Sequence, residues 1–135
     1  MSKSSLETIY PFKTDEVTPD RIEVERDFDS LQLIIAEVQK VHKIEGYILK
    51  NSARALINLC KAEDVFDLAL LTSEVFDSSS QLFEATNAGP LNSVVLEGSF
   101  LSVLCLSVGE NQLSIFVNRS VDCNCVLDMI VRRNF

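Results

Sequence analysis

Residues 100–118, FLSVLCLSVGENQLSIFVN, consist of two apolar segments that flank a short polar turn. The turn is GEN at 109–111. After it, side chains alternate between two faces, as in a half-buried strand. The segment before the turn is apolar on both faces, which is typical of a strand that is covered on both sides. The stretch therefore predicts an antiparallel hairpin of strands 100–108 and 112–118 in the middle of a sheet.

Outside this hairpin, the same reasoning predicts three further strands, at residues 44–49, 53–60 and 91–97. The first two are joined by a short loop, so they are expected to pair antiparallel. The strand at 91–97 is joined to the next strand by a short turn at Gly98. On its other side, no neighbour in the sequence is available to pair with it.

Three helices are predicted from apolar residues at helical spacing. The first begins at Asp29, a residue that can cap a helix, and continues to Val41. A long helix begins within 61–64 and stops at 87–90, where Gly89 is expected to supply the left-handed cap. Ser120 is expected to cap the last helix.

The predicted order is α-β-β-α-β-β-β-α, which is an α+β fold with helices on both faces of a largely antiparallel sheet. Residues 28–135 are expected to form this single domain. Residues 1–27 differ from the rest because they hold two of the three prolines and little periodicity. They are predicted to be an N-terminal arm, either mobile or laid over the domain surface.

Composition and charge limit the classes of partner. The 135 residues are 47% hydrophobic and carry a net charge of −8, from 20 acidic and 12 basic residues. Nucleic acids and anionic membrane surfaces require a basic face, so neither is expected as a partner. The sequence has no apolar run long enough to insert in a membrane and no apolar core of a signal peptide near its start, which predicts a cytoplasmic protein.

Residues with reactive side chains are few and poorly spaced for catalysis. His42 is the only histidine, and no nucleophile motif accompanies it. Cys123 and Cys125 are two apart, which on a helix would place one thiol in the interior and one at the surface rather than both on one metal ion. The four glycines do not form a phosphate-binding pattern. No catalytic residue, metal ligand or cofactor site is therefore predicted, and the chain is not expected to be an enzyme.

The long helix and the strand at 91–97 predict self-association. The helix carries apolar residues beyond those that one core face needs, and an unpaired strand edge favours pairing with another chain. A symmetric dimer, edge to edge and helix to helix, would bury both surfaces. The alternative is that the N-terminal arm covers the edge. The residues predicted to form the dimer interface are Val94, Val95, Leu96, Leu71 and Val75.

Five segments carry a resemblance to a known family. They are IEGYILKN (44–51), ARALINLC (53–60), LNSVVLEG (91–98), FLSVLCLSV (100–108) and QLSIFVN (112–118). With the helices around them, they resemble the Roadblock (dynein light chain) family, which includes bacterial gliding-protein B and Ragulator scaffold subunits. The resemblance spans residues 28–133. One departure is the first hairpin turn, where Asn51-Ser52-Ala53-Arg54 replaces the acidic residue and glycine that the family often has.

The resemblance implies a five-stranded antiparallel sheet with the long helix on one face and the two terminal helices on the other. It implies dimers, with itself or with a paralogous Roadblock protein, joined through the strands at 91–97 and the long helices. It also implies a non-catalytic scaffold or regulator that binds a small Ras-like GTPase or subunits of motor or membrane complexes.

Partner-binding residues are predicted on the long helix. Asp67, Glu74 and Asp77 could meet a basic partner, although an acidic helix face is as often simply solvated. A second hypothesis is GTPase activation by positioning the catalytic groups of the partner, with Arg54 reaching outward from its turn. A third is a profilin-like or longin-like adaptor, which shares the three-layer architecture.

Overall fold

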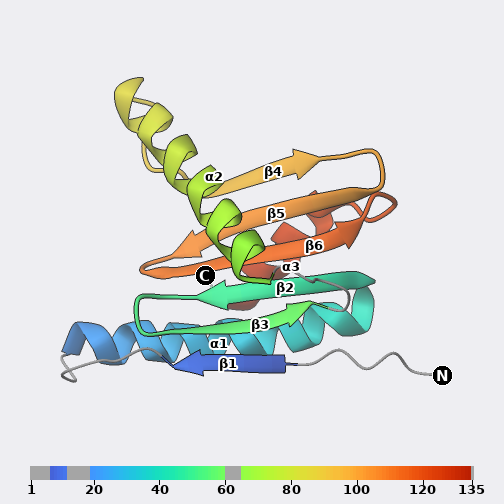
Figure 1. The fold of residues 1–135 in the computed structure, drawn as a ribbon, viewed down its shortest axis with the longest axis horizontal. Coiled ribbons are helices and arrows are strands. Elements are labelled where there is room, and N and C mark those ends of the chain that lie inside the picture. Colours follow the sequence, from blue (N-terminus) through green and yellow to red (C-terminus); the bar gives the residue numbers. More distant parts are fainter. Residues whose placement is uncertain (1–6, 12–18, 60–64, 135) are drawn as a thin grey trace.

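The computed structural model describes residues 7–11, 19–59 and 65–134, and the side chains of 21–59 and 70–132. The elements are β1 (Glu7–Pro11), α1 (Pro19–Val41), β2 (Ile44–Lys50), β3 (Arg54–Leu59), α2 (Val65–Ala85), β4 (Ser93–Glu97), β5 (Leu101–Val108), β6 (Asn111–Asn118) and α3 (Cys123–Asn134). The strands form one antiparallel sheet in the order β1-β3-β2-β6-β5-β4. Helices α1 and α3 lie behind this sheet and α2 crosses in front of it, which confirms the predicted α+β layers (Figure 1).

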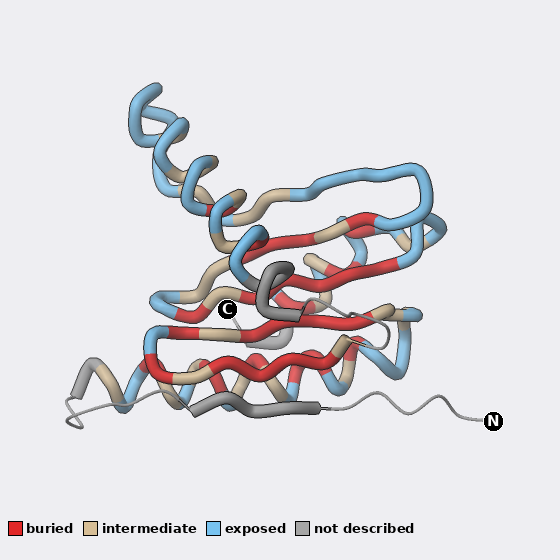
Figure 2. The backbone as a smooth tube through the Cα atoms, in the orientation of Figure 1, coloured by how far each residue is buried: buried red, intermediate tan, exposed pale blue. Residues whose placement is uncertain are grey.

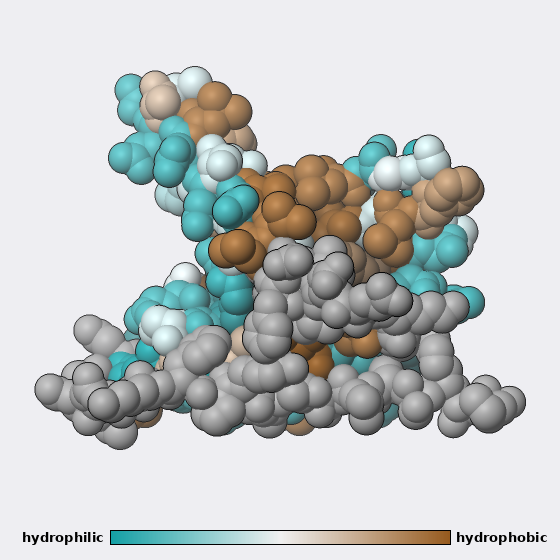
Figure 3. Space-filling view, viewed as in Figure 1, coloured by the Kyte–Doolittle hydropathy of each residue, from teal (hydrophilic) through white to brown (hydrophobic). Residues whose placement is uncertain are grey.

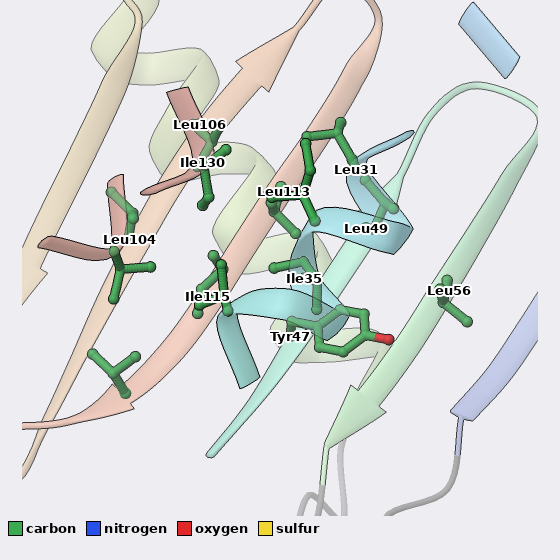
Figure 4. Packing of buried hydrophobic residues seen from close by; sticks show 14 of the residues in the cluster. Leu31, Ile35, Tyr47, Leu49, Leu56, Leu104, Leu106, Leu113, Ile115 and Ile130 are labelled. Atoms are coloured by element: carbon green, nitrogen blue, oxygen red, sulfur yellow. The ribbon is translucent and has the colours of Figure 1, made fainter. Parts of the chain in front are cut away.

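The main hydrophobic core lies between the sheet and the α1–α3 layer. Figure 4 shows Leu31 and Ile35 of α1 and Ile130 of α3 packed against side chains of the sheet such as Leu49 and Ile115. Each of these five is almost completely buried. A full burial of one such side chain stabilises the fold by about 1.5–3 kcal/mol, so this layer carries much of the stability.

Among the described side chains, the buried cluster on the α2 side of the sheet has fewer members than the main core. Its buried members are Ile48, Ala55, Ile57 and Phe116. From α2, Phe76 is buried over this face, whereas the second half of the helix extends past β4 and away from the sheet (Figure 1). Figure 2 shows this part of α2 as mostly exposed.

The N-terminal region contributes a sixth strand. Residues of β1 pair with β3 from Glu7 opposite Asn58 to Pro11 opposite Arg54. β1 therefore lies on the β3 edge of the sheet, and the described residues leave the β4 edge unpaired. β1 does not cover the strand at 91–97, because it occupies the opposite edge of the sheet. This part of the N-terminal arm therefore does not fulfil the hypothesis that the arm covers that strand.

The first helix begins ten residues earlier than the sequence predicts. α1 starts at Pro19, a residue whose fixed φ suits the first helical position, and Asp29 lies within the helix rather than at its cap. Val24 and Phe28 are both buried, and they continue the apolar stripe of Leu31 by one and two turns toward the N-terminus. The predicted start at Asp29 is wrong because this earlier part of the stripe was not counted.

Two caps also differ from the prediction. At the end of α2, Asn87 rather than Gly89 takes the left-handed conformation that directly follows the helix, with φ of 56°. The Ala88 N–H donates to Phe83 C=O and the Asn87 N–H donates to Glu84 C=O, which is a Schellman motif. At the start of α3, the side chain of Asp122 rather than that of Ser120 accepts a hydrogen bond from the helix, from the Asn124 N–H at 2.9 Å.

Candidate interaction surface

The free edge of β4 presents a defined set of backbone groups. The Gly98 N–H donates to Leu101 C=O at 2.8 Å, which makes this pair the hydrogen-bonded end of the β4–β5 ladder. Because hydrogen-bonded and non-hydrogen-bonded pairs alternate in an antiparallel ladder, Val94 and Leu96 direct their backbone groups toward β5. The N–H and C=O groups of Ser93, Val95 and Glu97 therefore point away from the sheet, and no strand among the described residues pairs with them.

The side chains of β4 are apolar and half-exposed over most of its length. Val95 is 39% exposed and Leu96 is 41% exposed. Val94 and Leu96 are on the α2 side of the sheet, because they pair with Cys105 and Val103, whereas Val95 is on the α1–α3 side. This combination of free backbone groups and apolar side chains is what a natural edge strand normally avoids.

Helix α2 directs an apolar stripe toward the same edge. Leu71, Val75 and Leu82 share one flank of the helix, and Leu71 and Leu82 are 55% and 61% exposed. The opposite flank faces the middle of the sheet, since Ser73 Oγ lies 3.4 Å from Gln112 Oε1 of β6. The stripe must therefore be on the β4 side, and Figure 3 shows apolar surface between α2 and the β4–β5 strands.

The five residues predicted for the dimer interface are thus grouped by the fold. Leu71, Val75, Val94 and Leu96 are on one side of the sheet, near its β4 edge, and Val95 is on the edge strand itself with its side chain on the other side. The sequence alone could identify them as unexplained apolar residues. Their common position depends on α2 crossing the sheet at an angle.

Of the three acidic residues predicted to bind a partner, the structure describes two side chains. Glu74 and Asp77 are exposed, and the side chain of Asp67 lies outside the described residues. The charge of Asp77 affects the pKa of Lys50 in β2. Burial lowers the pKa of the Lys50 ammonium, and the nearby charge of Asp77 partly opposes this effect. Asp77 therefore has a role inside the protomer, while Glu74 is the free acidic side chain of the two.

Arg54 is held inside the protomer rather than extended into solvent. Its guanidinium lies 3.8 Å from the centre of the Phe28 ring, and its Nη2 donates to Asp29 Oδ1 at 2.9 Å. Arg54 Nε lies 3.0 Å from Glu25 Oε1, an ion pair whose N–H geometry is not that of a hydrogen bond. These contacts join α1 to the β2–β3 turn, and they leave the side chain only 25% exposed.

Glu25 is the centre of a polar cluster that sequence reasoning missed. It accepts hydrogen bonds from Arg21 at 2.6 Å and from Asn51 at 3.1 Å, and Asn51 also donates to Asn111 Oδ1. Burial acts to raise the pKa of Glu25, but Arg21, Arg54 and Asn51 together lower it below its ordinary value. The cluster ties two turns of the sheet to α1, and Asn111 also donates to the Val24 carbonyl of α1, 87 residues away in sequence.

Two shallow hollows lie near the β4 edge. One, of about 550 Å³, is formed by the end of α2 and the loop that follows it, with Ser80, Phe83, Glu84, Asn87, Gly89, Pro90 and Leu91 as its lining. The other, of about 650 Å³, is on the opposite face between β4, β5 and the start of α3. The second is polar, with Glu97, Arg119 and Asp122 around it, and Arg119 lies 3.9 Å from Glu97.

The described cysteines and the histidine belong to no cluster of metal-binding side chains. Cys123 is buried and Cys125 is exposed, as their spacing on a helix predicted, while Cys60 lies outside the described residues. Burial and the charges of Asp122 and Glu97 raise the pKa of the Cys123 thiol, which keeps it protonated. Among the described residues, no cluster of His, Cys, Asp or Glu side chains suits a metal ion. In the same part of the chain, no helix has the length and hydrophobicity needed to cross a bilayer.

One apolar residue was misplaced by the sequence analysis. Phe100 was assigned to a central strand, but β5 begins at Leu101, and Phe100 is 85% exposed at the β4–β5 turn. The strand was also expected to be covered on both faces, but Leu101 at its start is 40% exposed. The signal that could have identified this turn is the Gly98-Ser99 pair, which precedes Phe100.

The comparisons with known proteins find a match among solved structures and none among family models or curated sequences. No family model matches the sequence, and no curated protein matches it. Among solved structures, the fold is similar to that of a Roadblock/LC7 domain from Streptomyces avermitilis, with a TM-score of 0.61 and 15% sequence identity. The match covers 75% of this chain and 88% of that one. The arrangement of helices and strands in this chain is therefore that of the Roadblock/LC7 fold.

Proposed function

We propose that this chain is a non-catalytic scaffold that forms a dimer through β4 and α2 and binds a regulatory partner as a dimer. The observation that carries the proposal is the β4 edge, where unpaired backbone groups adjoin an apolar flank of α2. Main-chain pairing at such an edge supplies affinity, and the apolar side chains beside it supply buried area. A second copy of the chain offers both features in self-complementary form.

The outward backbone groups favour one register for the two β4 strands. An antiparallel pair centred on Val95 lets the N–H and C=O groups of Ser93, Val95 and Glu97 all bond across the edge. Val95 then faces the partner's Val95, and Glu97 faces the partner's Ser93. A pair centred on Glu97 would instead place two carboxylates opposite each other, which is destabilising.

The first prediction concerns Val95→Asp, which would place two facing carboxylates in the centre of the pair. We expect the parent to elute at twice 15.1 kDa and the variant at 15.1 kDa in size-exclusion chromatography with light scattering. Leu33→Asp is the matched control, because Leu33 is 71% exposed on the outer face of α1. It is expected to stay dimeric. A parent that elutes as a monomer at high concentration contradicts the proposal.

The proposed partner is a small Ras-like GTPase or a subunit of a motor or membrane complex, as in the gliding-protein B and Ragulator branches of the Roadblock family. The fold likeness supports this class, and the net charge of −8 and the exposed Glu74 support a partner with a basic contact surface. A paralogous Roadblock chain is the alternative occupant of the β4 edge. The proposed location is the cytoplasm.

The partner is tested with a panel of purified small GTPases, each loaded with GDP or with a non-hydrolysable GTP analogue. We expect at least one to bind the parent, and Glu74→Lys to weaken that binding about tenfold with a reduced salt dependence. Glu23→Lys, at an exposed position of α1, changes the net charge by the same amount and is the matched control. If no GTPase in either nucleotide state binds, this part of the proposal is wrong.

GTPase activation remains the second hypothesis, and the geometry of Arg54 argues against an arginine finger from this position. The guanidinium is already held by Glu25, Asp29 and the Phe28 ring, so a role in the catalytic site of a partner would cost those contacts. Activation would have to come from positioning groups of the GTPase itself. Turnover of GTP by a bound GTPase, with and without the parent chain, distinguishes a scaffold from an activator.

A further inference from the structure

Phe100 at the β4–β5 turn is an unusually exposed aromatic residue. Its exposed fraction is 85%, the highest among the exposed large apolar residues described. It is next to Leu101, which is on the α2 side of the sheet and is 40% exposed. An exposed aromatic side chain at the tip of a hairpin is the type of residue that anchors protein interfaces.

The hollow of about 550 Å³ at the end of α2 has room for a side chain from outside the protomer. It is framed by Phe83 of the helix and by Gly89, Pro90 and Leu91 of the following loop. The Schellman motif at Asn87 fixes the direction in which this loop leaves the helix, so the hollow is a defined part of the fold. It lies just before β4, whereas Phe100 lies just after it.

The edge-to-edge register brings these two features together across the dimer. When the β4 pair centred on Val95 is continued past the ends of the strands, Phe100 stands level with the partner's Pro90. In Figure 1, the end of α2 extends past one end of β4, and the β4–β5 hairpin is at the other end. A two-fold axis perpendicular to the sheet at Val95 exchanges these ends and keeps α2 on the same side. It therefore brings the end of the partner's α2 over the hairpin.

We infer that Phe100 of each protomer inserts into the hollow at the end of α2 of the other protomer. This inference rests on the proposed dimer and adds its anchor. Each dimer contains the contact twice, so a single substitution removes two aromatic anchors. The end of the partner's α2 would then also cover Leu101 and Leu96, two apolar residues on the α2 side that are half-exposed in one protomer.

The inference is tested by the dissociation constant of the dimer, measured by sedimentation equilibrium. We expect Phe100→Ala to raise it at least tenfold, because truncation of an interface anchor usually has an effect of this size or larger. Leu33→Ala, at a similarly exposed site on α1, is expected to change it less than twofold. If the parent is a dimer and Phe100→Ala leaves the constant unchanged, this inference is overturned while the proposed function stands.

A second variant tests the hollow itself. Ser80→Trp places a large side chain in the hollow, and we expect it to raise the dissociation constant about as much as Phe100→Ala does. Because both changes remove the same contact, the double variant should be weakened by much less than the product of the two effects. Fully multiplicative effects would show that Phe100 and the hollow act separately, which overturns the inference.

A photo-crosslink locates the contact directly. The chain with p-benzoylphenylalanine at position 100 is mixed with a ¹⁵N-labelled parent chain, and crosslinked peptides are identified by mass spectrometry. We expect links from the unlabelled chain to residues 80–91 of the labelled chain. Links confined to one chain, or to another region of the partner, contradict the inference.

Discussion

At Gly46 the backbone of β3 approaches β2 so closely that a Cβ atom would lie 2.6 Å from the Asn58 carbonyl oxygen. The same atom would lie 2.7 Å from Leu59 Cδ2. A side chain can turn away from such a contact, but the carbonyl oxygen belongs to a paired strand and cannot move without breaking the ladder. The glycine is required here for space rather than for an unusual φ angle.

Gly46→Ala is therefore expected to lower the free energy of unfolding by about 1–3 kcal/mol, the usual cost of overpacking a core. Urea denaturation monitored by circular dichroism measures it. A loss smaller than about 0.5 kcal/mol, the scatter of ordinary surface substitutions, would mean that β2 and β3 separate easily at this point.

Glu25 gives a prediction about pH. Its pKa is lower in the folded chain than in the unfolded chain, so its ion pairs stabilise the fold at neutral pH. This contribution is complete above the unfolded pKa, near 4.5, and is lost as the pH falls through the lower folded pKa. We expect Glu25→Gln to be less stable than the parent at pH 7, with a difference that shrinks below pH 4.5.

The measurement is the thermal midpoint of both proteins between pH 7 and pH 3. Glu37→Gln is the control, because Glu37 pairs with Lys40 at the surface of α1, where such pairs contribute little. An unchanged difference between Glu25→Gln and the parent across this range would show that the carboxylate charge does not stabilise the fold.

Among the elements, β4 has the clearest consequence, because its successive amides have different partners. The N–H groups of Val94 and Leu96 face β5, whereas those of Val95 and Glu97 point out of the sheet and would donate only across the proposed dimer. In the dimer, all four amides are expected to exchange slowly with deuterated solvent. In the monomeric Val95→Asp variant, the amides of residues 95 and 97 should exchange much faster than those of 94 and 96.

Hydrogen exchange followed by NMR resolves these amides one by one. Equal protection of all four amides in the monomer would mean that another segment covers the edge. Equal loss of protection would mean that β4 separates from β5 when the dimer dissociates.

For the whole molecule, the sequence predicted the five strands of the main sheet because each alternates or is continuously apolar over its own length. β1 was missed because so short a strand gains its stability from pairing with β3. The sequence of residues 7–11 alone does not indicate that partner. The cluster around Glu25 was missed for the same reason, since Asn51 and Asn111 meet only after the sheet forms. The predicted interface residues were recognisable because apolar excess is a local signal, whereas the exposure of Phe100 depends on where the hairpin turns.

The position of β1 decides how far such assembly proceeds. A sheet with two open edges could add copies of itself without limit and grow into a fibre. Here one edge ends in a five-residue strand that contains Pro11, a residue without an N–H to offer a further strand. In the proposed dimer, two copies joined through β4 would have only these proline-bearing strands at the outer edges of the sheet, so association would stop at two chains.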